Sequence, residues 1–276
     1  DPQFETVFED EVVALPVKYE DMQKLFESIE KGSSAKLDTF MQEAQYKYEV
    51  GMRDFVNKPC HSWFEFVSLT IAKSAFKMDL LMDFSTHVRI FFKNPKLIAL
   101  MEFPVIFLGA MPDKIPALYS LMNYGGYKLG TWYPLGGFVK IINAMIEVAK
   151  MQGVHFHANT NVEKIVADEN LAKGLEIDGK IYSFDAIISS ADYHHTEQNL
   201  LEEQYRNYSQ QYWESRTFAP SCLIYYLGFN TKIPHLKHHT LFFENELYQH
   251  AHEIYTDKKW PTKPLFYACC PSKTDK

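Results

Sequence analysis

Two consecutive glycines follow a proline in the turn Pro134-Leu135-Gly136-Gly137, immediately before a helical pattern. Glycine tolerates a positive φ and has no Cβ, so Gly136 and Gly137 would let the backbone pass close to a bound ligand. The same residue types are also typical of an ordinary turn at the start of a helix. We therefore treat this turn as a candidate ligand-binding turn, and its chemistry alone leaves the structural alternative open.

A second group of small residues, Ser189-Ser190-Ala191-Asp192, ends an apolar run that is expected to form a strand. Small side chains at the carboxyl end of a strand permit close backbone approach to a cofactor. Ser190, Ala191 and Asp192 are therefore candidate cofactor-binding residues. Asp192 has an alternative role as a helix N-cap, since a helical pattern follows at Glu197.

Histidines that lie close together in the chain raise the question of a metal site. They are His155 with His157, His194 with His195, and His238 with His239. None of them has a carboxylate or a cysteine at a ligand spacing such as His-Glu-x-x-His. Adjacent residues on a strand also point to opposite faces of the sheet. We therefore predict no metal site, and we expect surface histidines or hydrogen-bonded loop histidines.

The composition argues against a nucleic-acid-binding protein and provides material for a large core. The chain has 276 residues, of which 46% are hydrophobic and 15% aromatic, and its formal net charge is −7. A nucleic-acid interface requires a basic patch, and no run of Lys and Arg supplies one. The chain begins at Asp1 without the segments of a signal peptide. Its four cysteines show no Cys-x-x-Cys spacing, which indicates reduced thiols in a cytoplasmic protein.

Apolar periodicity predicts mainly helices in the first half of the chain. Residues 1–16 alternate and predict a two-stranded hairpin that turns at residues 9–11. Residues 19–31 have helical spacing, and Ser33-Ser34 is expected to cap the next helix. Further helices are expected through residue 128, with breaks at Asn94-Pro95, Pro104, Pro112 and Pro116.

From Gly153 onward the apolar period changes to that of strands. Strands are predicted at residues 154–158, 162–167, 173–177, 180–184 and 186–190, and a helix at residues 197–211. Strands of another sheet are predicted at residues 220–229, 239–243 and 264–270. Alternating blocks of helix and strand favour an α+β or α/β fold with a helical insertion.

Residues 97–111 form the most apolar run of the chain. The run is too short to span a bilayer, and it contains Glu102 and Pro104. One interpretation is a pair of buried helices. The other is a monotopic surface element that enters one leaflet of a membrane.

Four segments, taken together, carry a resemblance to a known family. They are WYPLGG with its following helix, NTNVEKI, SSADYHHT, and the late run from PSCLIYYLGFN through PHLKHHTLFF to ACCPSKTD. In order and spacing they resemble the bacterial-type phytoene desaturases (phytoene dehydrogenases), a family of FAD-dependent carotenoid desaturases and isomerases. The family's GxGxxG motif matches nothing in this sequence, so the chain resembles an internal fragment of such a protein.

The resemblance implies a p-hydroxybenzoate-hydroxylase-like flavoprotein architecture. Residues 131–200 would form a partial FAD-binding domain from the Gly-Gly helix and a β-meander. Residues 1–19 and 201–276 would form an antiparallel substrate sheet. Residues 20–130 would form a helical insert at the membrane and the substrate entry.

The resemblance also implies roles for single residues. Val162 would pair its backbone with the adenine of FAD. Glu65 would face the polyene, where apolar surroundings would raise the pKa of its carboxyl and let it exchange a proton. Ser62 and Glu65 also fit a helix capping box, and this structural role stays open. The substrate tunnel would be lined by aromatic residues, namely Trp63, Phe64, Trp132 and Tyr133.

The implied activity is the introduction of C=C bonds into a carotenoid by hydride transfer to the flavin. Because such a substrate is insoluble in water, we expect a cytoplasmic protein that is peripheral at the inner face of the membrane. The alternatives are a carotenoid cis-trans isomerase of the same superfamily and a non-catalytic lipid-binding module at a membrane surface. This sequence contains no glycine-rich loop for the FAD pyrophosphate, so the 276-residue chain alone is expected to be inactive.

Overall fold

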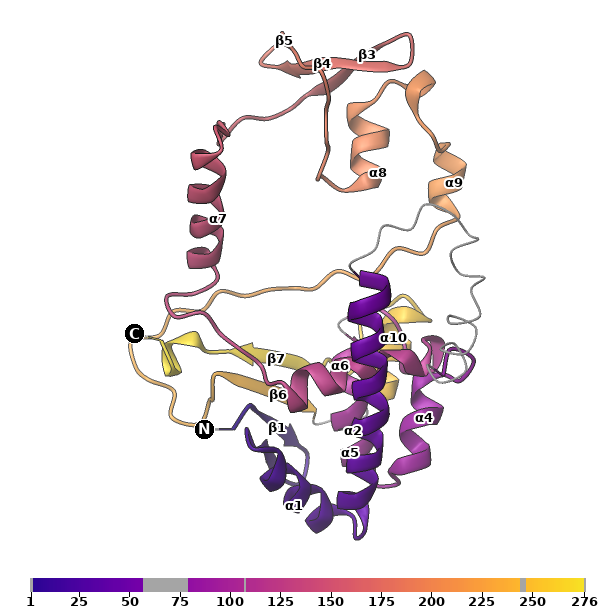
Figure 1. Cartoon of the computed structure of the whole chain (residues 1–276), viewed down its shortest axis with the longest axis vertical. Helices are drawn as coiled ribbons and strands as arrows, with labels where there is room; N and C mark the ends of the chain where they lie inside the picture. The colour runs from indigo at the N-terminus through magenta and orange to yellow at the C-terminus, as the bar shows by residue number, and fades with distance from the viewer. Residues whose placement is uncertain (1, 57–78, 107, 244–246, 276) are drawn as a thin grey trace. The chain divides into compact units, whose positions relative to one another are not determined.

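The computed structural model describes residues 2–56, 79–106, 108–243 and 247–275. The chain divides into two compact units. Unit 1 contains Asp1–Ile142 and Ala219–Lys276, and unit 2 contains Asn143–Phe218. The architecture is mixed, with helices and sheets in agreement with the predicted fold class at that level (Figure 1).

Unit 1 contains a four-stranded sheet in the order β2-β1-β6-β7. Its strands are β1 (Phe4–Phe8), β2 (Val12–Leu15), β6 (His239–Phe243) and β7 (Phe266–Cys269). β1 is antiparallel to β2 and parallel to β6, and β6 is antiparallel to β7. The strands predicted at residues 1–16, 239–243 and 264–270 form, and they meet in one sheet. The sheet is mixed because β1 and β6 are parallel, so the expectation of a wholly antiparallel sheet is wrong. The strand predicted at residues 220–229 does not form, and these residues have irregular backbone.

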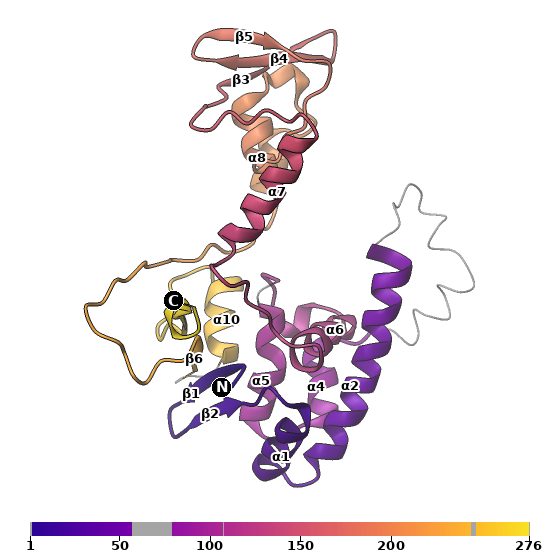
Figure 2. The ribbon, with the colours of Figure 1, turned by 60° about the vertical axis from the view of Figure 1, so that its left-hand side comes forward.

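The described part of unit 1 also contains helices and short helical turns. They are α1 (Tyr19–Ile29), α2 (Ser33–Val50), α4 (Phe84–Phe91), α5 (Pro95–Ile106), α6 (Leu121–Asn123) and α10 (Leu247–Tyr255), with short 3-10 or π turns η1 (Gly51–Val56), η3 (Pro112–Lys114), η4 (Ala117–Ser120), η5 (Tyr124–Lys128) and η8 (Pro271–Lys273). In both views α2, α4 and α5 lie side by side (Figures 1 and 2). The core consists mainly of aromatic and aliphatic side chains, with Phe26 and Phe40 fully buried and Phe26 in edge contact with Phe92.

The start of α2 differs from its prediction. Gly32 is the N-cap with a φ of +82°, and the hydroxyl of Ser33 is buried without a hydrogen-bond partner among the described residues. Instead, the carboxylate of Glu27 accepts the amides of Gly32 at 2.8 Å and Ser34 at 3.1 Å. The predicted Ser33-Ser34 cap is therefore wrong, because a side chain from the preceding helix satisfies the first donors of α2.

α5 continues through Pro104 to Ile106, so the break predicted at Pro104 is wrong. Proline has no N–H, which leaves the carbonyl of Leu100, four residues earlier, without its helical donor. The buried hydroxyl of Tyr127 donates to that carbonyl. α5 also packs into the core, and Leu97, Leu100 and Val105 are among its buried residues. This apolar run therefore agrees with the interpretation as buried helix.

Unit 2 contains a three-stranded antiparallel meander of β3 (Lys164–Asp168), β4 (Leu171–Ile177) and β5 (Lys180–Ser183). Its tight turns lie between the predicted strands, with positive φ at Glu169 and Asn170 and at Asp178 and Gly179. Positive φ at both central residues is the twist that two-residue hairpin turns require. Two other predicted strands, 154–158 and 186–190, do not form, since neither has a partner strand in the described sheet.

The remaining elements near or in unit 2 are helical. They are α7 (Val139–Met151), α8 (Tyr193–His195), η6 (Thr196–Leu200), η7 (Glu203–Tyr205) and α9 (Gln210–Glu214). α7 confirms the helix predicted after the Gly-Gly turn, and none of its residues is buried. The single helix predicted at residues 197–211 is wrong. The carboxylate of Glu197 accepts the amides of Asn207 and Tyr208, which turns this segment back on itself.

None of the helices in the described part of the chain combines the length and the apolar character needed to cross a bilayer.

Candidate functional site

The turn at residues 134–137 has the backbone that its glycines predict. Gly136 and Gly137 both have a φ of +81°. A Cβ on Gly136 would lie 2.7 Å from Cε of Lys140, so the space beside the backbone is already limited. The amide of Gly137 donates to the carbonyl of Pro134 at 2.9 Å and closes the turn. The turn is therefore tight, and the side chain of any other residue at Gly136 would be strained.

Asp275 holds this turn from the far end of the sequence. Its Oδ2 accepts the amide of Gly136 at 2.6 Å and the hydroxyl of Tyr133 at 3.3 Å. Burial, followed by the neighbouring Asp275 carboxylate, raises the pKa of Tyr133. The anchor was missed at the sequence level because 139 residues separate Asp275 from Gly136.

Tyr133 also contacts the end of the unit 1 sheet. Its ring lies 4.6 Å from the ring of His238, which in turn lies 4.3 Å from the ring of His239. His238 directly precedes β6, which begins at His239 as predicted, so the alternation of side chains along the strand does not apply to this pair. Cys269 is paired with His239 across β6 and β7.

Trp132, a predicted substrate-contacting residue, is 85% exposed, and its indole donates to the carbonyl of Leu129 at 3.2 Å. The other predicted residues of this kind, Trp63 and Phe64, and the predicted acid Glu65 with its neighbour Ser62, lie outside the described residues. Among the predicted aromatic residues that the structure describes, Tyr133 lies beside Asp275 and His238. The tunnel assignment of all these residues stays a prediction.

The candidate cofactor residues Val162, Ser190, Ala191 and Asp192 belong to unit 2, whereas Gly136 and Gly137 belong to unit 1. Val162 is half-buried just before β3. Ser190, Ala191 and Asp192 are exposed. Their roles toward a cofactor stay predictions.

Asp192 caps a helix, which was the alternative interpretation of this residue. It is the N-cap of α8, and its Oδ1 accepts the amide of His195 at 2.8 Å. The preceding Ser189 hydroxyl is hydrogen-bonded to the hydroxyl of Thr196 at 2.8 Å. These two contacts fix the small-residue segment against the first turn of the helix.

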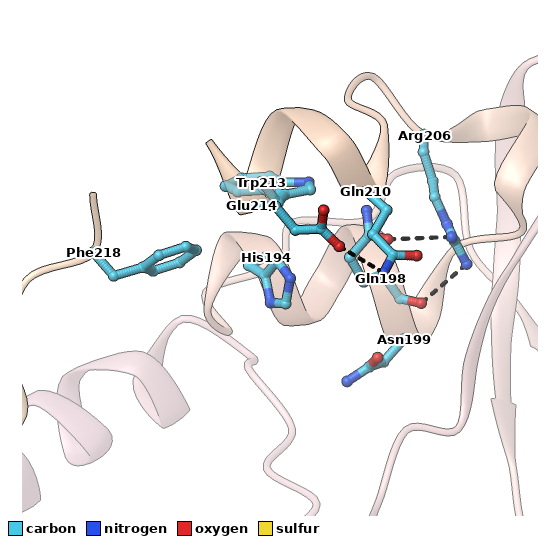
Figure 3. Close-up of a pocket in the computed structure, with 8 residues that line it drawn as sticks. All are labelled: His194, Gln198, Asn199, Arg206, Gln210, Trp213, Glu214 and Phe218. Carbon is cyan, nitrogen blue, oxygen red and sulfur yellow. Dashed lines mark hydrogen bonds between the residues drawn. The ribbon is translucent and has the colours of Figure 1, made fainter. Parts of the chain in front are cut away.

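A hollow of about 640 Å³ opens in unit 2 beside this segment (Figure 3). His194, Trp213 and Phe218 form its aromatic side, with ring distances from His194 of 5.2 Å to Trp213 and 5.6 Å to Phe218. Arg206 lies on the polar side, where its guanidinium donates to the carbonyl of Gln198 at 3.0 Å and to the side-chain oxygen at 3.3 Å. One side of the hollow is therefore aromatic and the other is polar.

The helical part of unit 1 contains a buried group of charges. Lys47 is fully buried, and its ammonium has three acceptors: Asp79 at 2.8 Å, Ser120 at 3.1 Å and the carbonyl of Ala117 at 3.3 Å. These three acceptors match the three N–H donors of an ammonium.

His87 lies next to this group, with its Nε2 3.6 Å from the carboxylate of Glu43. Burial, followed by the positive charge of Lys47, lowers the pKa of His87 to about 4. Burial raises the pKa of Glu43. Both shifts favour the neutral forms of the two side chains, which is the expected effect of a low-dielectric surrounding.

Comparison with known proteins gives a family match over nearly the whole chain. The sequence pattern of the flavin containing amine oxidoreductases matches residues 34–275. The chain belongs to this family. The cofactor of the family is a flavin, which confirms the FAD implied by the sequence resemblance.

The curated relatives refine the match. A carotenoid 3,4-desaturase of Haloarcula japonica is 30% identical over 277 aligned positions, which cover all of this chain and 56% of the relative. A zeta-carotene-forming phytoene desaturase of Myxococcus xanthus is 26% identical over 92% of this chain and 49% of the relative. A 4,4'-diapophytoene desaturase of Staphylococcus aureus is 22% identical over 97% of this chain and 54% of the relative. The chain spans about half the length of these relatives, and the predicted resemblance to carotenoid desaturases is confirmed.

Proposed function

We propose that the protein to which this chain belongs is an FAD-dependent carotenoid desaturase that introduces C=C bonds into a phytoene-like hydrocarbon. The observation that carries the proposal is the match of the whole chain to carotenoid desaturases within a flavin-dependent family. The tight Gly136-Gly137 turn supports it through its positive φ, and residues 190–192 support it because they are exposed.

The residues present fit part of a flavin site. Val162 would offer its backbone to the adenine, and Ser190, Ala191 and Asp192 leave open surface for a neighbouring group. Gly136 and Gly137 would bring the backbone close to the cofactor. No glycine-rich phosphate loop of the GxGxxG type occurs in this sequence, so these residues do not complete the site. In this proposal the p-hydroxybenzoate-hydroxylase-like arrangement is the architecture of the whole protein.

When bound, FAD supplies a hydride acceptor for a saturated carbon of the hydrocarbon. The protein must then orient the chain, exclude water and accept the proton lost from the neighbouring carbon. We assign proton acceptance to Glu65, because a carboxylate among apolar side chains binds a proton more readily than one in water. Tyr133, Trp132, Trp63 and Phe64 would supply the apolar wall of the substrate path.

We further propose that the protein binds peripherally at the cytoplasmic face of a membrane, because its hydrocarbon substrate resides there. The apolar run of α5 is packed in the core, so it does not provide the membrane contact. Exposed apolar side chains elsewhere in unit 1 are better placed for this, among them Leu81, which is 97% exposed. A monotopic contact of this type buries apolar side chains only to the depth of one leaflet.

The test uses the purified full-length protein, FAD and liposomes that contain phytoene, 4,4'-diapophytoene or lycopene in separate reactions. We expect products with additional conjugated double bonds, separated by chromatography and recognised by their longer absorption wavelength. A cis-trans change without new double bonds would replace the proposal by the isomerase. Liposome binding without any product would replace it by the lipid-binding module.

A further inference from the structure

Four side chains converge at one end of the unit 1 sheet, and we call them the sheet-end cluster: His238, His239, Tyr267 and Cys269. Potential ligand atoms of His238, His239 and Cys269 all lie within 4.8 Å of one another. His239 and Cys269 face each other across the β6–β7 pair, and Tyr267 precedes Cys269 by two residues on the same strand face. Two imidazoles and a thiol thus meet at one point.

The two ring nitrogens of His238 differ in their hydrogen bonding. Nε2 of His238 is buried and has no hydrogen-bond partner among the described residues. Its Nδ1 lies 2.6 Å from the hydroxyl of Thr274. That hydroxyl in turn donates to the carbonyl of Pro271 at 3.4 Å, so it accepts from Nδ1–H of the ring. In that tautomer Nε2 is unprotonated, and its buried lone pair can bind a cation or accept a hydrogen bond.

The second histidine is held in the same way. Nδ1 of His239 lies 2.5 Å from the hydroxyl of Tyr267. Metal-bound histidines commonly use one ring nitrogen for the metal and the other for a hydrogen bond to an oxygen atom, which fixes the orientation of the ring. Thr274 and Tyr267 provide this oxygen for His238 and His239 respectively. The cluster therefore contains both ligands and the groups that orient them.

We propose that the sheet-end cluster binds one zinc ion through Nε2 of His238, Nε2 of His239 and the thiolate of Cys269, with water as the fourth ligand. Two imidazoles and a thiolate are ligands that Zn²⁺ prefers. Tetrahedral coordination at Zn–N and Zn–S bond lengths spaces the ligand atoms by roughly 3.3–3.6 Å. The three atoms all lie within 4.8 Å of one another, so small side-chain movements bring them to this spacing. This inference does not depend on the proposed desaturase activity.

The zinc would act as a structural clamp. It would join the first residue of β6 to the last residue of β7 and hold the loop that carries Thr274 and Asp275. Asp275 anchors the Gly136 amide, so the clamp would stabilise the turn through this loop. This proposal differs from the expectation of no metal site, which considered spacing along the chain and the faces of strands but not the pairing of β6 with β7.

The main experiment measures zinc binding to the full-length protein by equilibrium dialysis and by X-ray absorption at the zinc edge. We expect one zinc per chain, with one sulfur and two imidazole ligands. Cys269→Ser should weaken binding at least tenfold, whereas the matched control Cys270→Ser, at the next position, should leave it unchanged. Tyr267→Phe should weaken it about tenfold, the range measured when a group that orients a ligand is lost.

A second measurement avoids any dependence on the folding of variants. Cysteine alkylation of the unmodified protein, read by mass spectrometry, should be slowed at Cys269 at least tenfold by one equivalent of zinc and unchanged at the exposed Cys222. Zinc bound through oxygen and nitrogen alone, or equal alkylation rates at Cys269 with and without zinc, would overturn the proposal. Binding retained in Cys269→Ser and lost in Cys270→Ser would overturn it as well.

Discussion

Lys47 and His87 are ionisable side chains in the helical core of unit 1, with His87 nearly and Lys47 completely buried. A buried ammonium is tolerated only when its donors are paired, and Lys47 has an acceptor for each. Buried His87, in contrast, remains neutral, as its lowered pKa indicates. These two residues therefore determine how the core responds to mutation and to acid.

Removing the Lys47 ammonium should destabilise unit 1. In Lys47→Ala the chain loses a buried ion pair and leaves Asp79, Ser120 and a carbonyl without their donor. We expect the free energy of unfolding to fall by about 3 kcal/mol, at the lower limit for a buried pair because Asp79 is partly exposed. Urea unfolding followed by circular dichroism measures this. The control Lys24→Ala, which breaks the exposed pair with Asp21, should change it by less than about 1 kcal/mol.

Acid should destabilise the same core through His87. Its pKa is about 4 in the folded protein and about 6.5 in the unfolded chain, so the unfolded chain binds the proton more readily. Stability is therefore complete above pH 6.5 and is lost as the pH falls toward 4, by roughly 3 kcal/mol at most. The raised pKa of Glu43 offsets part of this loss.

The measurement is the free energy of unfolding between pH 7 and pH 4 in the unmodified chain and in two variants. His87→Gln should reduce the slope with pH, whereas His235→Gln, at an exposed histidine of the same unit, should retain it. An unchanged slope in His87→Gln would show that other groups cause the acid sensitivity.

Asp192 combines a demonstrated capping contact with a predicted cofactor contact. Asn caps helices about as well as Asp, so Asp192→Asn should leave the stability of the full-length protein unchanged, whereas Asp192→Ala should cost about 1 kcal/mol. If the carboxylate also contacts the cofactor, Asp192→Asn should weaken FAD affinity. Equal FAD affinity of Asp192→Asn and the unmodified protein would restrict Asp192 to its capping role.

At the scale of elements, the turn at Gly136 directly precedes α7 and is hydrogen-bonded to Asp275. Gly136→Ala introduces a Cβ at a φ of +81° and 2.7 Å from the Lys140 side chain. We expect a loss of at least about 1 kcal/mol in stability and a greater loss of flavin affinity in the full-length protein. The control Gly126→Ala lies within η5 with no atom within 4 Å of the new Cβ, and it should be neutral or stabilising. Equal effects of the two substitutions would show that the turn has no special requirement for glycine.

The elements that were predicted correctly are determined by residues close together in the sequence. β3, β4 and β5 form where alternation and two-residue turns coincide, and α1 forms where apolar spacing ends at Gly32. The failures depend on distant partners. Residues 154–158 alternate but lack a neighbouring strand, and α5 passes Pro104 because Tyr127 replaces the missing donor.

In the candidate site, too, local features could be predicted and contacts between distant residues could not. The positive φ of Gly136 and Gly137 could be predicted from residue type. The anchoring by Asp275 could not, because the two residues are 139 positions apart. The meeting of His238, His239 and Cys269 depends on the register of β6 with β7, which no spacing along the chain reveals.

At the scale of the whole molecule, α7 has an apolar stripe that is exposed in the described part of the chain. Met145, Val148 and Met151 are 67%, 60% and 83% exposed. Contiguous exposed apolar surface promotes self-association in isolation. We expect the 276-residue chain alone to elute from size exclusion as oligomers, and the triple substitution of these three residues by Gln to increase the monomer fraction. Asn143→Gln, on the same helix, is the control and should change nothing.

The proposed desaturase activity requires that electrons pass from the hydrocarbon to the flavin of this protein. The most direct measurement is a single turnover without oxygen, in which the full-length FAD-loaded protein is mixed with phytoene in liposomes and the flavin absorbance is followed. We predict bleaching of the oxidised flavin band, with one new C=C bond formed for each flavin reduced. A flavin that stays oxidised while the hydrocarbon binds or only changes its cis-trans geometry would contradict the account.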